Sequence, residues 1–170
     1  WWITANSDSH VHNSEGGSDF WPGEYSKTYV WAEKTHDSII DGVRNGRMFV
    51  TTGDLIDQLF VTLSSSTNKA RTGGTLSKPE GEGVKLQIRF RDPVGPNFRG
   101  DYPAVARVDL ILGEMSRDTR SPDTDSNETT RVIARFAPDD WKSLDGFYGI
   151  DYEIHNVMQN SYIRVRGTNT

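Results

Sequence analysis

Val84-Lys85-Leu86-Gln87-Ile88-Arg89-Phe90-Arg91 is the stretch that decides the fold of this 170-residue chain. Its apolar and polar residues alternate strictly, so that every second side chain is apolar. In an extended strand successive side chains point to opposite faces of a sheet, and this segment therefore predicts one buried and one solvent-facing side. The pattern is typical of an antiparallel sheet that covers a hydrophobic core with one face.

The same period of two recurs on both sides of this stretch. Further alternating segments lie at 59–63, 107–112, 131–136, 148–154 and 162–166. The connections between them are rich in Gly, Pro, Asn and Ser, which are the residues that favour turns and loops. Six half-buried strands in succession predict an antiparallel β-sandwich over residues 55–170.

Basic residues occupy many of the positions that should face outward on these strands. They are Lys85, Arg89, Arg91, Arg131, Arg135, Arg164 and Arg166. The whole chain carries a net charge of −5, so bulk electrostatics disfavour a nucleic-acid partner. We therefore interpret these residues as a solvated face, and the alternative is a phosphate-binding patch. No apolar run approaches the roughly 20 residues that a membrane span needs, and the absence of cysteine excludes disulfides and thiolate chemistry.

The period changes to that of a helix just before the first of these strands. Thr35 is a suitable N-cap, and Gly46 is a suitable stop after the last turn. The apolar positions with helical spacing are Ile39, Ile40 and Val43. The sequence predicts one principal helix near 36–45 and a short strand at 48–51. Residues 13–33 contain Gly, Pro and several aromatic side chains, and we expect them to form a packed loop.

A second informative stretch, Ile3-Thr4-Ala5-Asn6-Ser7-Asp8-Ser9-His10-Val11-His12, lies near the start. The apolar run that begins at Trp1 predicts a buried strand that ends at small polar residues. Asp8, His10 and His12 are spaced two apart, so in an extended segment all three would point into one cleft. Carboxylate oxygen and imidazole nitrogen suit Zn, Mn or Fe. The alternative is a surface turn whose histidines are simply solvated.

The stretch 3–52 resembles the end of a PHP domain, which belongs to the polymerase and histidinol phosphatase superfamily of metal-dependent phosphoesterases. Ser7-Asp8-Ser9-His10 matches the superfamily's last metal-binding motif. Pro22-Gly23-Glu24-Tyr25 is similar to the loop that follows this motif in larger bacterial members. The segment 37–46 with Arg47-Met48-Phe49-Val50 resembles their closing helix, and the β-rich remainder is similar to the sandwich that they carry behind the barrel.

The resemblance implies an α+β, mostly β fold. In it the end of a distorted (βα)₇ PHP barrel at residues 1–54 is followed by an antiparallel β-sandwich domain at 55–170. It also implies two or three divalent metal ions (Zn, Mn or Fe) in the complete site, with Asp8 ligating one and His10 another. His12 lies outside the shared motif, and we expect it to contact substrate or to support a ligand. The implied chemistry is hydrolysis of a small-molecule phosphoester by metal-activated water.

The superfamily's earlier motifs, among them a first His-x-His, a glutamate and further histidines, have no counterpart in this chain. Asp8 and His10 alone cannot hold several metal ions. We therefore expect a fragment that is inactive in isolation and whose partner is the remaining N-terminal part of the barrel. We expect the whole protein to be periplasmic or secreted. The competing hypothesis is a non-catalytic β-sandwich binding module for carbohydrate or a protein partner.

Overall fold

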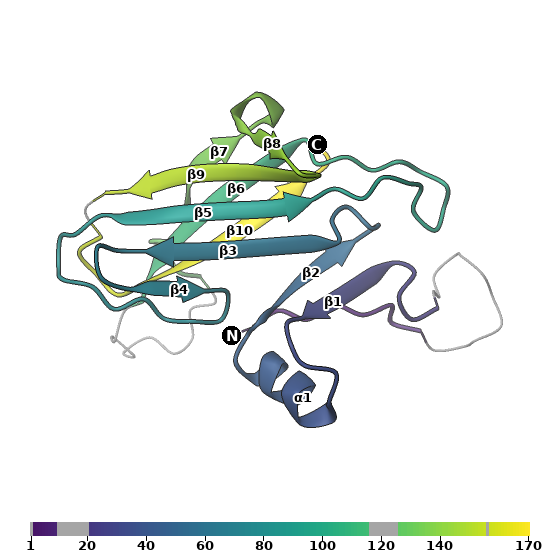
Figure 1. Ribbon diagram of the computed structural model, residues 1–170, viewed down its shortest axis with the longest axis horizontal. Coiled ribbons are helices and arrows are strands. Elements are labelled where there is room, and N and C mark those ends of the chain that lie inside the picture. Colours follow the sequence, from purple (N-terminus) through teal and green to yellow (C-terminus); the bar gives the residue numbers. More distant parts are fainter. Residues whose placement is uncertain (1, 10–20, 116–125, 156) are drawn as a thin grey trace.

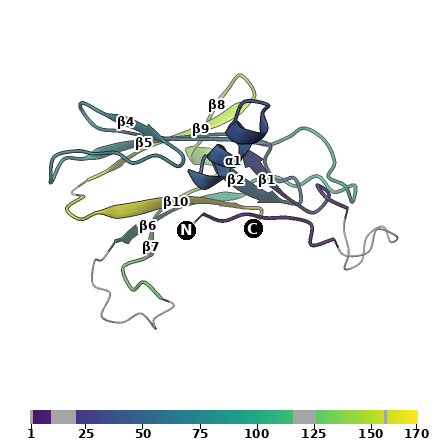
Figure 2. The same ribbon diagram turned by 90° about the horizontal axis from the view of Figure 1, so that it is seen from below.

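The computed structural model is a two-layered antiparallel β-sandwich with a small helix-containing hairpin beside it (Figures 1 and 2). It describes residues 2–9, 21–115, 126–155 and 157–170. Within these ranges, no helix combines the length and the apolar character that crossing a membrane requires.

One layer of the sandwich is a five-stranded sheet in the order β4-β3-β5-β9-β8. Its strands are β3 (Gln58–Ser64), β4 (Lys69–Arg71), β5 (Val84–Arg91), β8 (Lys142–Leu144) and β9 (Phe147–Ile154). The other layer is a three-stranded sheet in the order β10-β6-β7. Its strands are β6 (Arg107–Glu114), β7 (Arg131–Phe136) and β10 (Ser161–Thr168). All six alternating segments are therefore strands, and the predicted antiparallel sandwich is confirmed.

The hydrophobic core lies between the two sheets. Alternate side chains of β5 are buried, as its sequence pattern predicts. They pack against side chains of β9 and of the central strand β6 in the facing sheet. The shared cluster contains Leu86, Ile88, Phe90, Val105, Val108, Leu110, Leu112, Ile150 and Ile154. Trp141 closes one end of the core, where its ring meets Phe90 edge-on with centroids 5.1 Å apart. Trp141 follows a short 3₁₀ helix, η1 (Pro138–Asp140).

The hairpin beside the sandwich consists of β1 (Ser26–Val30) and β2 (Met48–Thr52), which pair antiparallel. Helix α1 (His36–Arg44) lies between them in sequence. The helix prediction is confirmed at both ends: the Thr35 hydroxyl accepts from the Ser38 N–H at 3.3 Å, and Gly46 adopts a left-handed φ of +65°.

The expected loop at 13–33 is wrong where β1 stands. Tyr29 lies directly opposite Phe49 in the register, and the two rings stack with centroids 4.8 Å apart. Thr, Tyr and Val favour extended pleated backbone, but pairing with a strand some twenty residues further along the chain is what makes this segment a strand.

The predicted buried strand at the start of the chain is also wrong. Residues 2–9 form no regular secondary structure, and Trp2 and Ile3 are exposed. The segment is bound to β1 by a side chain and not by backbone hydrogen bonds between strands. The Thr28 hydroxyl accepts from the Ala5 N–H at 2.9 Å and donates to the Ala5 carbonyl at 2.8 Å. Because the Thr28 side chain binds both the N–H and the carbonyl of Ala5, these two groups are not paired with the backbone of β1. Trp1 lies outside the described residues.

Two of the contacts between the hairpin and the sandwich are especially close. The Trp31 and Phe60 rings lie 5.7 Å apart between the hairpin and β3. After β4 the backbone of Gly73 passes so near the end of α1 that an added Cβ would lie 2.2 Å from the Asn45 carbonyl oxygen. Gly73 also has a left-handed φ of +81°, so this approach depends on glycine for two reasons.

Candidate metal site

Asp8 lies near the end of the N-terminal segment 2–9, which is hydrogen-bonded to β1. The preceding residue, Ser7, is buried, and the Asn6 carbonyl accepts a hydrogen bond from the Ser26 hydroxyl. The side chain of Asn6 accepts from the Asp8 N–H at 2.9 Å, which closes a local turn. These contacts place the aspartate near the end of the hairpin where β1 begins and β2 ends.

The backbone of Asp8 is not extended. Its φ of +54° lies in the left-handed region, which aspartate tolerates better than most residues. The extended backbone that the sequence predicted for this segment is therefore wrong at Asp8. The residue as a whole is exposed to solvent.

His10 and His12 lie outside the described residues, and their placement relative to Asp8 stays a prediction. Among the residues that are described, no group of three or more His, Cys, Asp or Glu side chains is arranged to hold a metal ion. The residue types of the motif nevertheless fit Zn, Mn or Fe, because carboxylate and imidazole groups are ligands that these ions accept. His36, which begins α1, is exposed on the helix surface.

A charged pair lies at the same end of the hairpin as Asp8. The Lys27 ammonium donates to the Asp54 carboxylate, and both side chains are half-buried. The adjoining turn is held by the Gly53 N–H, which donates to the Tyr25 carbonyl at 2.8 Å. Sequence reasoning missed this pair because only the pairing of β1 with β2 brings residues 27 positions apart into contact.

A small hollow of about 150 Å³ lies between the hairpin and β3. Its lining is mainly aromatic: Tyr29, Val30, Trp31, Phe49, Asp57, Gln58 and Phe60. The polar rim is held by Asp57, whose two carboxylate oxygens accept from Arg91 at 2.8 and 2.6 Å. These hydrogen bonds raise the pKa of the Arg91 guanidinium further above its usual value. The aromatic residues were visible in the sequence, but their meeting across three strands was not.

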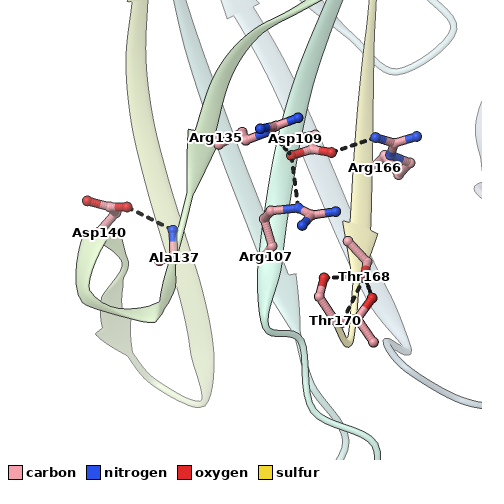
Figure 3. A network of polar contacts seen from close by, with 8 residues as sticks. All are labelled: Arg107, Asp109, Arg135, Ala137, Asp140, Arg166, Thr168 and Thr170. Atoms are coloured by element: carbon pink, nitrogen blue, oxygen red, sulfur yellow. Dashed lines mark hydrogen bonds and ion pairs between the residues drawn. The ribbon is translucent and has the colours of Figure 1, made fainter.

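A second polar centre lies on the outer face of the three-stranded sheet, where the Asp109 carboxylate is fully buried among arginines (Figure 3). Its Oδ2 accepts from Arg166 Nη2 at 2.6 Å, and its Oδ1 lies 3.2 Å from Arg107 Nε and 3.4 Å from Arg135 Nε. The hydrogen bond from Arg166 and the positive charge of its neighbours hold the pKa of Asp109 below its usual value in spite of the burial.

Replacing Asp109 with asparagine should make the fold less sensitive to acid. A carboxyl whose pKa is lowered by folding stabilises the folded state above its unfolded pKa, and this contribution is lost as the pH falls through the folded pKa. Urea unfolding between about pH 4 and pH 2 should therefore show a steeper loss of stability in the wild type than in Asp109→Asn.

Asp92→Asn provides a control of opposite sign. Burial raises the pKa of Asp92, so ionisation of this carboxyl opposes folding, and acidification relieves that cost. Because the folded pKa of Asp92 lies above its usual value of 3.8, this relief develops mainly above about pH 4. Urea unfolding extended upward to about pH 6 should therefore show a steeper loss of stability on acidification in Asp92→Asn than in the wild type. If the free energy of unfolding fell equally fast with pH in the wild type and in Asp109→Asn, the lowered pKa of Asp109 would be contradicted.

The fold and these centres define an antiparallel β-sandwich protein with an appended helix-containing hairpin. No protein-family model, curated protein or solved structure matches the chain.

Proposed function

We propose that the chain is the C-terminal part of a PHP-type metal-dependent phosphoesterase. Residues 1–54 would complete the barrel, and residues 55–170 would form the sandwich behind it. The observation that carries the proposal is the order of three features: the Asp8-Ser9-His10 motif, a helix that stops at Gly46, and a short strand directly after it. This is the order that the resemblance to the superfamily requires.

The roles of the residues follow from the motif. Asp8 would hold one divalent ion and His10 another, and His12 would contact the substrate or support a ligand. Bound ions of this kind activate water and neutralise charge on a phosphoryl group. The double hydrogen bond between Thr28 and Ala5 and the burial of Ser7 tie the segment that leads to Asp8 to β1.

An exposed apolar surface supports the second part of the proposal, that the N-terminal part of the barrel is the partner of this chain. Trp2, Ile3, Ile39 and Ile40 are 56%, 59%, 42% and 48% exposed. The indole of Trp2 donates from Nε1 to the Arg44 carbonyl at 3.1 Å, so the first residues and α1 adjoin. Large apolar side chains gathered in this way are uncommon on soluble monomers unless another surface covers them.

The proposal is tested by comparing the isolated chain with the complete protein, including all preceding sequence. Elemental analysis should find divalent metal in the complete protein, together with hydrolysis of a simple aryl phosphate. The isolated chain should show neither, because it supplies too few ligands. A complete protein that binds no divalent metal, or that binds it without hydrolysing any phosphoester, would overturn the proposal.

Substituting Ile39 or Ile40 with aspartate should affect the two forms differently. In the isolated chain the side chains are exposed, so the free energy of unfolding should change by less than about 0.5 kcal/mol. In the complete protein each change would place a charge in a covered apolar surface, and the loss should be about 2 kcal/mol or more. Urea unfolding of both forms measures the difference. Val94→Asp, at a fully exposed position, should be neutral in both, and equal effects of Ile39→Asp in both forms would contradict the interface.

A carbohydrate-binding module is the second candidate, and the aromatic hollow between the hairpin and β3 favours it. Aromatic faces beside a fixed Arg91–Asp57 pair offer both the apolar surface and the polar groups that a sugar ring needs. Tryptophan fluorescence during titration with neutral oligosaccharides tests it. Saturable quenching in a protein that binds no metal would favour this candidate over the phosphoesterase.

A further inference from the structure

We propose that the outer face of the three-stranded sheet binds a small dianionic oxyanion, a phosphate or sulfate group, through Arg107, Arg135 and Arg166. These residues belong to the sandwich and not to the N-terminal segment that carries Asp8, so the inference does not depend on the proposed phosphoesterase activity. It revises the expectation that the outward-facing arginines only form a solvated face.

The strand register brings the three arginines together. Asp109 on β6 lies opposite Arg135 on β7 and opposite Arg166 on β10. Arg107 precedes Asp109 by two residues on the same strand and therefore points to the same face. Figure 3 shows the three guanidinium groups arranged around the single carboxylate. Residues from three neighbouring strands thus form one compact cluster.

The charge of this cluster is not balanced. One guanidinium is enough to pair with the buried carboxylate, yet three surround it, which leaves an excess of two positive charges in a chain whose net charge is −5. Arg164, two residues before Arg166, adds a further positive charge on that face and lies over the Tyr162 ring. The nearby Asp140 carboxylate accepts from the Ala137 N–H at 2.8 Å instead of entering the cluster (Figure 3). A bound dianion would neutralise the excess.

The donors that such an anion needs are gathered around one carboxylate and are accessible. The side chains of Arg107, Arg135 and Arg166 are 39%, 66% and 57% exposed. Arg107 and Arg135 approach Asp109 through Nε, on the inner side of the guanidinium group. Arg166 is hydrogen-bonded to the carboxylate, whereas Arg107 and Arg135 are drawn to it as ion pairs, and all three side chains remain partly open to solvent. Guanidinium forks match tetrahedral oxyanions well, and prior orientation lowers the entropic cost of binding.

Titration of the ¹⁵N-labelled chain with inorganic phosphate at constant ionic strength tests the proposal. Saturable amide shifts should centre on β6, β7 and β10 around Asp109. Arg135→Gln and Arg107→Gln, tested separately, should each weaken the affinity about tenfold, which is typical for loss of a charge-assisted hydrogen bond. Arg71→Gln is the matched control, because Arg71 is an exposed arginine on β4 of the other sheet. It should change the affinity less than about twofold.

Further ligands identify the chemical source of the anion. Inorganic sulfate should bind comparably, and nitrate, which carries one charge, should bind more weakly. Glucose 6-phosphate should produce the same shifts if the site accepts a monoester, whereas binding of the free ions alone would assign it to inorganic anions. The spectra also report whether each variant is folded. Absence of saturable shifts, or equal weakening by Arg71→Gln in folded protein, would overturn the proposal.

Discussion

Replacing Asp8 with alanine in the complete protein should lower phosphoester hydrolysis on the order of a thousandfold and reduce the bound metal. A metal-ligating carboxylate neutralises the charge of the cation and fixes its position. Its loss should therefore forfeit most of the several kcal/mol that a metal contributes to the transition state, at 1.36 kcal/mol for each tenfold in rate. His10→Ala should behave in the same way, and turnover together with metal stoichiometry are the measurements.

His36→Ala is the matched control because this histidine lies on the exposed surface of α1 beyond the motif. It should leave turnover and metal content unchanged. His12→Ala should fall between the two cases, with a loss of about 10- to 100-fold, as is typical for groups that support a ligand. Asp8→Ala with near-wild-type turnover and metal content would exclude the metal site, since no other part of this chain matches the superfamily's ligand motif.

Leu110→Ala should lower the free energy of unfolding by about 2–5 kcal/mol. Leu110 is fully buried in the middle of β6 and packs in the cluster shared by both sheets. Truncation removes the free energy of burying the isobutyl group and leaves a cavity between two sheets that are tied by their own ladders and cannot close onto it. Urea unfolding with an unchanged m-value is the measurement.

Leu144→Ala is the control for residue type. Leu144 ends the edge strand β8 and is 68% exposed, so the same substitution should change the free energy of unfolding by less than about 0.5 kcal/mol. Comparable losses for the two leucines would mean that the core does not lie between the sheets.

Local pattern determined most of the secondary structure of this protein. The alternation in 84–91 predicted β5 because a strand with one buried face must place apolar side chains at every second position. The helix was predictable in the same way, because Thr35 and Gly46 satisfy the backbone at its two ends and need no distant partner. The sandwich followed from the number and spacing of the strands.

The candidate metal site was only partly predictable. The sequence identified the residue types of the motif, because a carboxylate and two imidazoles within five residues are chemically distinctive. It did not predict the turn at Asp8, which depends on the Asn6 side chain and on the Ser26 hydroxyl of a strand some twenty residues away. A strand at that segment would have needed backbone hydrogen bonds to a neighbouring strand, but the Thr28 hydroxyl binds both backbone groups of Ala5 instead.

Tertiary structure alone decided which charges and rings meet. Asp109 alternates in sequence like any outward-facing strand residue, yet the register places Arg135 and Arg166 on either side of it and thereby buries it. The aromatic hollow likewise depends on the meeting of β1, β2 and β3. Sequence periodicity reports which face of an element is apolar, whereas the partner of each residue depends on contacts between distant segments, which local sequence does not encode.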